Sequence, residues 1–116
     1  MDDERLRVVC LCAQWCGVCR DYAMLFERAA RDYAGRADFV RLDIEDEAEL
    51  LDPVEVENFP TVLLMRGARV LFYGTITPQP ATLARLVERA LAGELRPLAA
   101  VPEIDALAQR ILAARR

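Results

Sequence analysis

A continuous apolar run near the start of the chain, RVVCLCA (Arg7–Ala13), constrains the fold more than any other feature. It lacks the polar alternation of a half-exposed strand and is typical of a strand buried on both faces. Such a strand lies inside a sheet that carries helices on both sides. With 116 residues and 54% hydrophobic content, the chain has enough apolar material for one core and needs no disulfide staples to fold. Its cysteines are therefore available for chemistry.

The later elements follow from hydrophobic periodicity and from breaker residues. The pattern first predicts a helix over about 18–33 ended by Gly35, a strand over 37–44, and a short acidic helix within 45–57 that stops near Pro53. It then predicts two strands, over 61–65 and 69–73, about a turn at Arg66-Gly67-Ala68. The last two elements are a helix that starts at Thr77-Pro78 and ends at Gly93, and an amphipathic helix over Pro102–Ala114. The expected fold is α/β, a four-stranded mixed sheet flanked by helices, with an extra C-terminal helix. The first two strands should be parallel through a right-handed crossover, and the last two should form a hairpin antiparallel to them.

The segment AQWCGVCRDY (13–22) places Cys16 and Cys19 close together in a chain that has four cysteines and no histidine. Such a pair can chelate a metal, form a structural disulfide, or exchange electrons with the disulfide of another protein. Cys16 lies between the expected first strand and first helix, where unpaired backbone N–H groups stabilise an anion. A thiolate is the nucleophile of disulfide exchange. Cys19, one helical turn further on, is placed to resolve a mixed disulfide formed at Cys16.

The charge pattern and the N-terminal segment bear on the compartment and on possible partners. No apolar run approaches the roughly 20 residues of a membrane span, and the N-terminal MDDERLR is charged and has no signal-peptide core. We expect a cytoplasmic protein in a reducing compartment, where a CxxC pair is more often catalytic or metal-binding than structural. The net charge of −4, without a basic cluster, argues against nucleic acid as the main ligand. Neither nucleic acid nor a membrane is an expected partner.

Two motifs together resemble the thioredoxin family: WCGVC (15–19) after a buried strand, and Phe59-Pro60-Thr61 before another strand. The resemblance covers roughly residues 6–91. It implies that Cys16 is the exposed nucleophile and that Cys19 is the buried resolving thiol, supported by Gly17 and Val18. It also implies a cis-proline at Pro60 that faces the dithiol.

The resemblance further implies a groove for an extended substrate peptide beside the two cysteines. The carbonyl and N–H groups of Phe59 would pair with that peptide, and Trp15 would form a flat wall beside the Cys16 sulfur. Gly74-Thr75 corresponds to a glycine-containing loop that borders the groove. The expected substrate-binding residues are Trp15, Phe59, Pro60, Thr61, Gly74 and Thr75.

Three positions depart from the family pattern. Val18 stands where the family has a proline, Cys10 where it has an acidic residue beneath the cysteine pair, and Arg41 where it has a lysine. The missing carboxylate would have helped to deprotonate the resolving thiol, and Arg41 keeps a positive charge but cannot release a proton. Val18 restores an N–H group near the Cys16 sulfur, because only proline lacks one. Together, Val18 and Cys10 predict a couple somewhat more oxidising than that of thioredoxin.

Cys10 and Cys12 lie on one face of the expected first strand, the face that looks toward the dithiol. They could form a second redox pair, a relay to Cys19, or a metal site with Cys16 and Cys19. All four thiols fall within the ten residues of CLCAQWCGVC, whereas four-thiolate sites normally take their ligands from two separated knuckles. The simpler interpretation is that Cys10 and Cys12 are small buried hydrophobes, and no metal is expected.

These features predict a thiol–disulfide oxidoreductase that reduces or exchanges protein disulfides and needs no cofactor. Its expected partners are disulfide-containing proteins and an upstream reductase or dithiol protein, and it is expected to act as a monomer. Residues 1–93 would form the thioredoxin-like domain, and 94–116 a linker and an amphipathic helix packed on that domain. Two alternatives stay open: a metal-binding module that uses the four cysteines, and an adaptor that uses the fold only to dock partners.

Overall fold

The computed structural model describes residues 5–13, 15–98 and 101–114. Its elements are β1 (Leu6–Cys12), α1 (Gly17–Asp32), β2 (Ala37–Asp43), α2 (Ala48–Leu51), β3 (Thr61–Arg66), β4 (Arg69–Thr75), α3 (Pro80–Leu91) and α4 (Pro102–Ala114). This order confirms the elements expected from the sequence, with small shifts at most of their ends.

The largest shift is at the start of α3. This helix begins at Pro80 and not at Thr77-Pro78 as predicted. Pro80 occupies a first-turn position, where its missing N–H group costs no hydrogen bond and its ring fixes a helical φ angle. The hydroxyl of Thr77 instead lies 2.6 Å from that of Thr82. The predicted end holds, because Gly93 follows the helix with a φ of 75°, a conformation that favours glycine.

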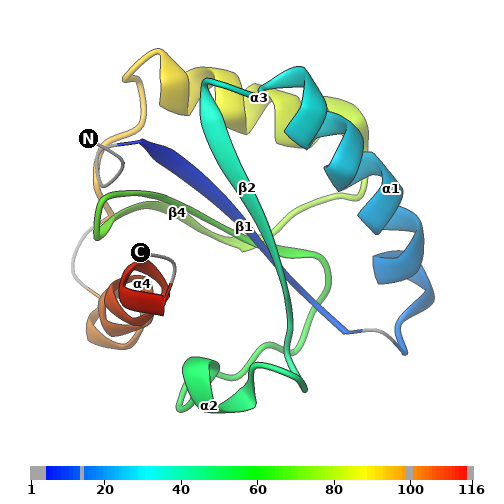
Figure 1. Ribbon diagram of the computed structural model, residues 1–116, viewed down its shortest axis with the longest axis vertical. Helices are drawn as coiled ribbons and strands as arrows, with labels where there is room; N and C mark the ends of the chain where they lie inside the picture. The colour runs from blue at the N-terminus through cyan, green and yellow to red at the C-terminus, as the bar shows by residue number, and fades with distance from the viewer. Residues whose placement is uncertain (1–4, 14, 99–100, 115–116) are drawn as a thin grey trace.

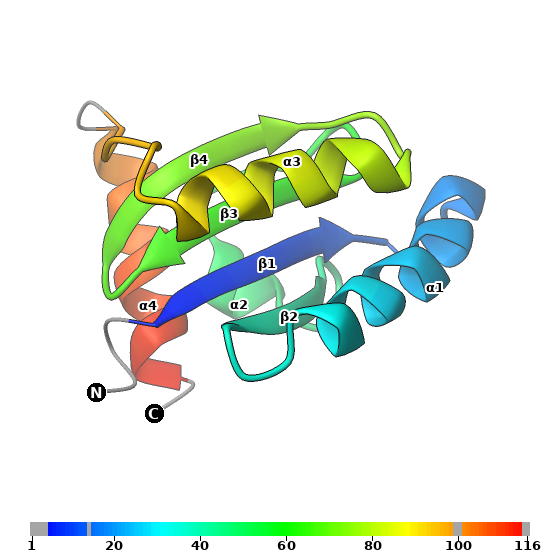
Figure 2. The same cartoon turned by 90° about the horizontal axis from the view of Figure 1, so that it is seen from above.

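The sheet has the strand order β2-β1-β3-β4. β1 pairs in parallel with β2 and antiparallel with β3, and β3 pairs antiparallel with β4. The parallel first pair and the hairpin are therefore confirmed. The prediction that both hairpin strands oppose the first two was wrong for β4, because the second arm of a hairpin reverses direction and so runs with β1. Figure 2 shows β1 between β2 and β3, pointing toward the start of α1.

Both faces of the sheet are buried, as the apolar run of β1 predicts. Side chains alternate along the strand, so Val8, Cys10 and Cys12 pack on one face with α1 and α3. Val9 and Leu11 pack on the other face with α2 and α4. Figure 1 shows the two pairs of helices on opposite sides of the sheet. We call these sides the thiol face and the α4 face.

The α4 helix covers the second side of the sheet. Its buried side chains are those of Ile104, Leu107, Ala108 and Ile111. The Nε–H of Arg110 donates to the carbonyl of Leu50 at 2.7 Å, which attaches α4 to α2. The N–H of Leu98 donates to the carbonyl of Val70 at 2.8 Å, which attaches the segment after α3 to β4. None of the helices in the described part of the chain has the length and apolar character needed to cross a bilayer.

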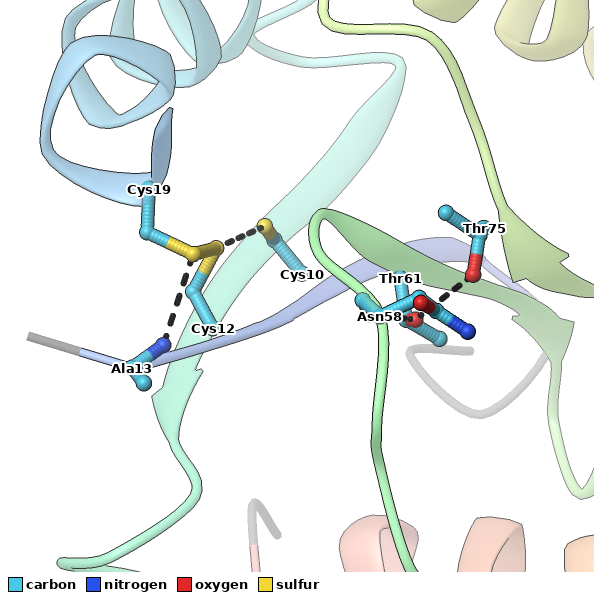
Figure 3. The surroundings of a disulfide bond; sticks show 7 residues. All are labelled: Cys10, Cys12, Ala13, Cys19, Asn58, Thr61 and Thr75. Carbon is cyan, nitrogen blue, oxygen red and sulfur yellow. Dashed lines mark hydrogen bonds between the residues drawn. A yellow bond between two sulfur atoms is a disulfide. The ribbon is translucent and has the colours of Figure 1, made fainter. Parts of the chain in front are cut away.

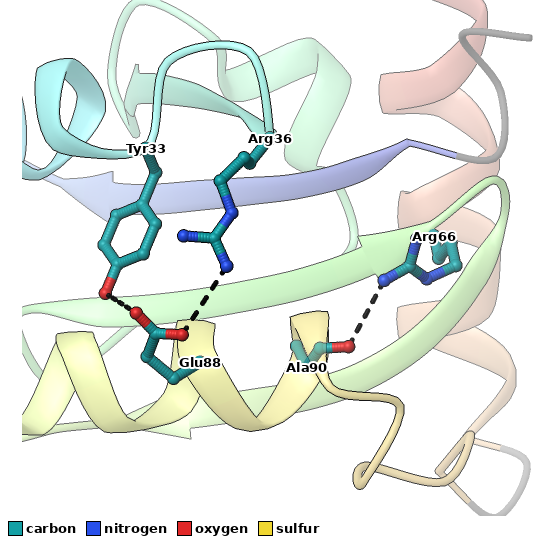
Figure 4. A network of polar contacts seen from close by, with 5 residues as sticks. All are labelled: Tyr33, Arg36, Arg66, Glu88 and Ala90. Carbon is teal, nitrogen blue, oxygen red and sulfur yellow. Dashed lines mark hydrogen bonds and ion pairs between the residues drawn. The ribbon is translucent and has the colours of Figure 1, made fainter.

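A polar network holds α1 and α3 together at the C-terminal end of α1 (Figure 4). The hydroxyl of Tyr33 donates to Oε2 of Glu88 at 2.8 Å, and Nη2 of Arg36 lies 3.7 Å from Oε1 of the same carboxylate. Burial and the hydrogen bond to Glu88 raise the pKa of Tyr33. From β3, Nη2 of Arg66 donates to the carbonyl of Ala90 at 3.2 Å. The contacts of Tyr33 and Arg36 therefore hold α1 against α3 at the end of α1 that is opposite to Cys16.

Candidate functional site

The site forms where β1 ends and α1 begins. Cys16 is the N-cap residue of α1, with extended backbone angles (φ −86°, ψ 122°). Its N–H donates to the carbonyl of Ala13 at 3.1 Å, and its carbonyl accepts from the N–H of Arg20 at 3.1 Å. Cys16 is half-buried and carries a free thiol. This is the helix-terminal location that the sequence predicts for the thiol.

Cys19 lies in the first turn of α1 and is joined by a disulfide to Cys12, the last residue of β1. The two Cα atoms are 5.7 Å apart, and the side chains are only 4% and 6% exposed. Figure 3 shows Cys19 reaching from the helix toward Cys12 on the strand. The N–H of Ala13 donates to Sγ of Cys19 at 3.4 Å. The structure thus pairs Cys19 with the strand cysteine, and not with Cys16 as the motif suggests.

Cys10 is the second free thiol and lies deep in the thiol face. Its Sγ–H donates to Sγ of Cys12 at 3.7 Å (Figure 3). Burial raises the pKa of the Cys10 thiol to about 12, although the guanidinium of Arg41, its cross-strand neighbour in β2, acts in the opposite direction. Cys10 therefore stays a protonated thiol at neutral pH and is a poor nucleophile.

The expected groove residues fall into two contact groups, one around Phe59 and Pro60 and one around Thr61 and Thr75. In the first, the peptide bond between Phe59 and Pro60 is cis, which confirms the prediction from the WCGVC motif. The ring of Phe59 is packed edge-on against Trp15, with centroids 5.8 Å apart, and Trp15 is 64% exposed. The Pro60 carbonyl accepts from the N–H of Ile76 at 3.1 Å. Trp15, directly before Cys16 in the chain, therefore presents an exposed aromatic ring that the half-buried Phe59 supports.

The second group, Thr61, Gly74 and Thr75, lies at the paired ends of β3 and β4. Thr61 is buried, and its hydroxyl donates to the carbonyl of Asn58 at 2.6 Å and lies 3.3 Å from the hydroxyl of Thr75 (Figure 3). Gly74 and Thr75 are the last two residues of β4, so the prediction of a loop at these positions was wrong. Gly74 pairs across the strands with Val62, and a Cβ atom there would lie 3.5 Å from the ring of Phe72. The side chain of Thr61 is thus used inside the fold, whereas Thr75 at the strand end is exposed.

The supporting positions of the motif are open to solvent. Val18 is 44% exposed in the first turn of α1. A Cβ atom at Gly17 would meet nothing closer than Nη2 of Arg20 at 3.8 Å, so local packing does not require glycine. Arg41, in the position of the family lysine, lies 3.8 Å from the carboxylate of Glu27. The positive charge expected at this position is present, and it is paired with this acid.

A pocket of about 600 Å³ opens beside the disulfide. Its lining residues are Cys12, Ala13, Cys19, Arg20, Ala23, Arg41, Leu42, Asp43, Asp46 and Glu47. Charged side chains of both signs surround it, so water can approach the two sulfurs despite their burial. Neither Cys16 nor Trp15 lines this pocket, which makes it distinct from the aromatic surface of Trp15 and Phe59.

The metal-binding alternative finds no support in this geometry. Within the described ranges, no group of three or more His, Cys, Asp or Glu side chains is arranged to hold an ion. Two of the four candidate ligands, Cys12 and Cys19, are bonded to each other. The arrangement instead favours chemistry between sulfur atoms.

Sequence reasoning missed the direct bond between Cys12 and Cys19. A signal was available, because Cys12 is the last residue of its strand and so lies nearest to the start of the following helix. Cys10 is two residues further back, about 7 Å along the strand. A second cis peptide bond, between Asp52 and Pro53, was also missed, since no family motif surrounds it.

Comparisons with known proteins agree with this fold. The family described as Thioredoxin matches residues 1–88. Thioredoxin M3, chloroplastic, of Oryza sativa subsp. japonica is 31% identical over 80 residues, which cover 69% of this chain and 46% of that protein. A thioredoxin of Staphylococcus aureus is 33% identical over 67 residues, which cover 58% of this chain and 64% of that protein. The matches thus span about half to two thirds of the length of these relatives.

Solved structures give the same result. The germline-specific thioredoxin Deadhead of Drosophila melanogaster superposes with a TM-score of 0.68 at 25% identity, over 76% of this chain and 83% of that one. A thioredoxin of Fasciola hepatica superposes with a TM-score of 0.67 at 26% identity, over 74% and 81% of the respective chains. The fold and the WCGVC site define a thioredoxin-fold protein with redox-capable cysteines. The chain belongs to the thioredoxin family.

Proposed function

We propose that this chain catalyses thiol–disulfide exchange with protein disulfides. The Cys16 thiolate attacks a substrate disulfide and forms a mixed disulfide, and the substrate's other sulfur leaves as a thiolate. The Cys19 thiolate then attacks the Cys16 sulfur, which releases the second substrate sulfur and leaves a Cys16–Cys19 disulfide. The substrate gains two electrons, the chain loses two, and no cofactor takes part.

One observation carries this proposal: the chain holds a half-buried free thiol at a helix N-terminus, one turn before a buried cysteine whose sulfur already forms a disulfide with Cys12. The exposed Trp15 and the edge-packed Phe59 offer a surface for a substrate peptide next to this thiol. Catalysis requires an accessible nucleophile and a sheltered resolving thiol. Cys16 and Cys19 fit these two roles.

The chemistry also suggests partners and a compartment. Each turnover leaves the chain oxidised, so a reductase or another dithiol protein must return two electrons. Such a cycle runs in a reducing compartment, and we place it in the cytoplasm. The α4 helix already covers the second face of the sheet, so a second copy is not needed to bury it, and the chain is proposed to act as a monomer.

An insulin-reduction assay with dithiothreitol as the electron source tests this function. The wild-type chain should accelerate the precipitation of reduced insulin, and Cys16→Ser should lower the rate by roughly three orders of magnitude, toward the uncatalysed reaction. Cys10→Ala is the matched control, because this thiol is buried and unbonded. Equal rates for wild type and Cys16→Ser would refute catalysis at Cys16. Partner binding that survived in that case would favour the adaptor alternative.

A further inference from the structure

We propose that Cys12 is a third exchange thiol, which takes over the disulfide of Cys19 from Cys16 and so leaves Cys16 free in the oxidised chain. The inference rests on the proposed function, since substrate reduction supplies the initial Cys16–Cys19 disulfide. It assigns a role to the one disulfide that the structure describes, Cys12–Cys19.

Cys19 has two possible partners on different elements. Cys16 precedes it by one helical turn at the start of α1, and Cys12 is bonded to it from the end of β1. A sulfur atom forms one disulfide at a time, so the two pairings exclude each other. They also leave different thiols free. A Cys16–Cys19 bond leaves the buried Cys12, whereas the Cys12–Cys19 bond leaves the half-buried Cys16 beside the exposed Trp15.

The exchange between the two pairings is balanced within the chain. The Cys12 thiol loses its proton to water in the adjoining pocket, which both Cys12 and Cys19 line. Its thiolate attacks Sγ of Cys19, the bond between Cys12 and Cys19 forms, and the bond to Cys16 breaks. Cys16 leaves as a thiolate with the electron pair of the broken bond. The number of disulfides and the oxidation state of the chain do not change, so no outside oxidant is required.

Cys10 does not share this role, although it lies on the same face of the same strand. It is free in the structure, and its contact with the Cys12 sulfur is a 3.7 Å hydrogen bond. Burial also raises the pKa of its thiol to about 12, which leaves little thiolate for attack. Cys10 is therefore the natural control for any effect assigned to Cys12.

The consequence concerns the oxidised protein. With a Cys16–Cys19 disulfide alone, it would have no accessible thiol and would wait for a reductant. With the Cys12–Cys19 disulfide, it keeps a nucleophile at the groove and can form a mixed disulfide with a further protein. The oxidised chain would then be able to shuffle disulfides as well as receive electrons.

Disulfide mapping of the wild-type chain tests the proposal without any variant. The reduced protein is oxidised with one equivalent of insulin disulfide, quenched with acid, alkylated with N-ethylmaleimide, and cut with trypsin and chymotrypsin. Cleavage after Arg7, Leu11, Trp15 and Arg20 puts Cys10 on fragment 8–11, Cys12 on fragment 12–15, and Cys16 and Cys19 on fragment 16–20. We expect fragments 12–15 and 16–20 to stay linked by one disulfide, with one maleimide on 16–20 and one on 8–11. A disulfide inside 16–20, with one maleimide on 12–15 and one on 8–11, or a link from 8–11 to 16–20, would overturn the proposal.

A short iodoacetamide pulse on the oxidised proteins gives an independent reading. Oxidised wild type and Cys10→Ala should each show a fast-reacting thiol at Cys16, and oxidised Cys12→Ala should have lost it. Fast alkylation of oxidised Cys12→Ala at the wild-type rate would contradict the proposal. The insulin assay separates a failure of the proposed function from a failure of the proposal for Cys12. A wild-type chain that reduces insulin but maps only to Cys16–Cys19 refutes the third thiol alone, and one that reduces no insulin refutes the proposed function.

Discussion

The two faces of the sheet are equally buried but differ in chemistry. The α4 face joins Val9 and Leu11 of β1 to the aliphatic side chains of α4. The thiol face, one residue out of phase on the same strand, joins Cys10 and Cys12 to α1 and α3. Both faces bury apolar side chains, yet only one has sulfur atoms at the point where a helix begins. The side of the sheet that Cys10 and Cys12 face therefore determines which side of the molecule can carry out thiol–disulfide exchange.

The two faces therefore have different roles. The α4 face buries apolar side chains, and its contribution is measured by the free energy of unfolding alone. The thiol face supplies burial as well, and its last strand residue also positions the sulfur that meets Cys19. Substitutions on the α4 face should therefore change the free energy of unfolding without changing the chemistry, and substitutions near the end of β1 should change both.

The largest expected effect is on the α4 face. Leu107 is fully buried in α4, so Leu107→Ala should lower the free energy of unfolding by about 2 to 5 kcal/mol, a large share of the roughly 5 to 15 kcal/mol typical of a domain. Urea denaturation of the reduced protein measures this. Leu83→Ala, at a buried position of α3 on the thiol face, should cost a similar amount. A loss below about 1 kcal/mol for Leu107→Ala would show that α4 is not part of the core.

The second effect is a loss of stability at alkaline pH, caused by a buried thiol of the thiol face. The pKa of Cys10 is raised from 9.0 to about 12 by burial, so the folded state holds this proton more tightly than the unfolded state. Stability is therefore complete below pH 9 and falls between pH 9 and 12, by about 1.4 kcal/mol for each pH unit. Cys10→Ala should flatten this part of the pH profile in urea denaturation. The raised pKa of Tyr22 leaves a residual slope at higher pH.

An unchanged slope in Cys10→Ala between pH 9 and 10 would contradict the burial of this thiol. The variant Cys10→Ser should also lack this fall of stability with pH, because a serine hydroxyl does not ionise in this range. A fall as steep as that of the wild type would contradict the account. Leu11→Ala, the neighbouring position on the α4 face, serves as the control. It should lower stability at every pH by the same amount.

A smaller effect is expected at the groove. Phe59 packs against Trp15 and the thiol-face core, and Val56, in the same loop, packs against the α4 face. An aromatic pair contributes about 0.5 to 1.5 kcal/mol, so Phe59→Ala should lower kcat/KM for insulin by roughly three- to tenfold. Val56→Ala should leave kcat/KM unchanged. Equal effects of the two variants would argue against a substrate surface at Trp15 and Phe59.

Much of this architecture could be predicted from the sequence, because local patterns determine it. The unbroken apolar run of β1 required a strand buried on both faces, and WCGVC together with Phe59-Pro60-Thr61 indicated the cis bond at Pro60. The position of Cys12 at the end of its strand favoured it over Cys10 as the partner of Cys19, but the bond itself could not be predicted in the same way. Strand alternation placed Cys10 and Cys12 on the correct face, but their distances from Cys19 depend on how α1 docks over the sheet. Docking is a property of the packed core and not of any local segment.

The smallest expected effect is on the redox potential. Val18 has a backbone N–H in the first turn of α1 that proline would remove. A donor of this kind contributes about 0.5 to 1 kcal/mol to the thiolate, which corresponds to roughly 10 to 20 mV. Val18→Pro should therefore lower the potential by that amount. Equilibration with glutathione, followed by the fluorescence of Trp15 in a Cys12→Ala background, measures the Cys16/Cys19 couple alone. A rise in potential would show that the argument has the wrong sign.

The most direct test of the account is to trap the attacking thiol. In the double variant Cys12→Ala/Cys19→Ser, Cys16 keeps its position at the start of α1, and both the resolving thiol of Cys19 and its disulfide partner Cys12 are removed. Incubation with insulin followed by mass spectrometry should show a covalent adduct on Cys16 that dithiothreitol releases. No adduct should form when Cys16→Ser is added to the double variant. An adduct that persists without Cys16, or its absence from the double variant, would contradict the assignment of Cys16 as the nucleophile.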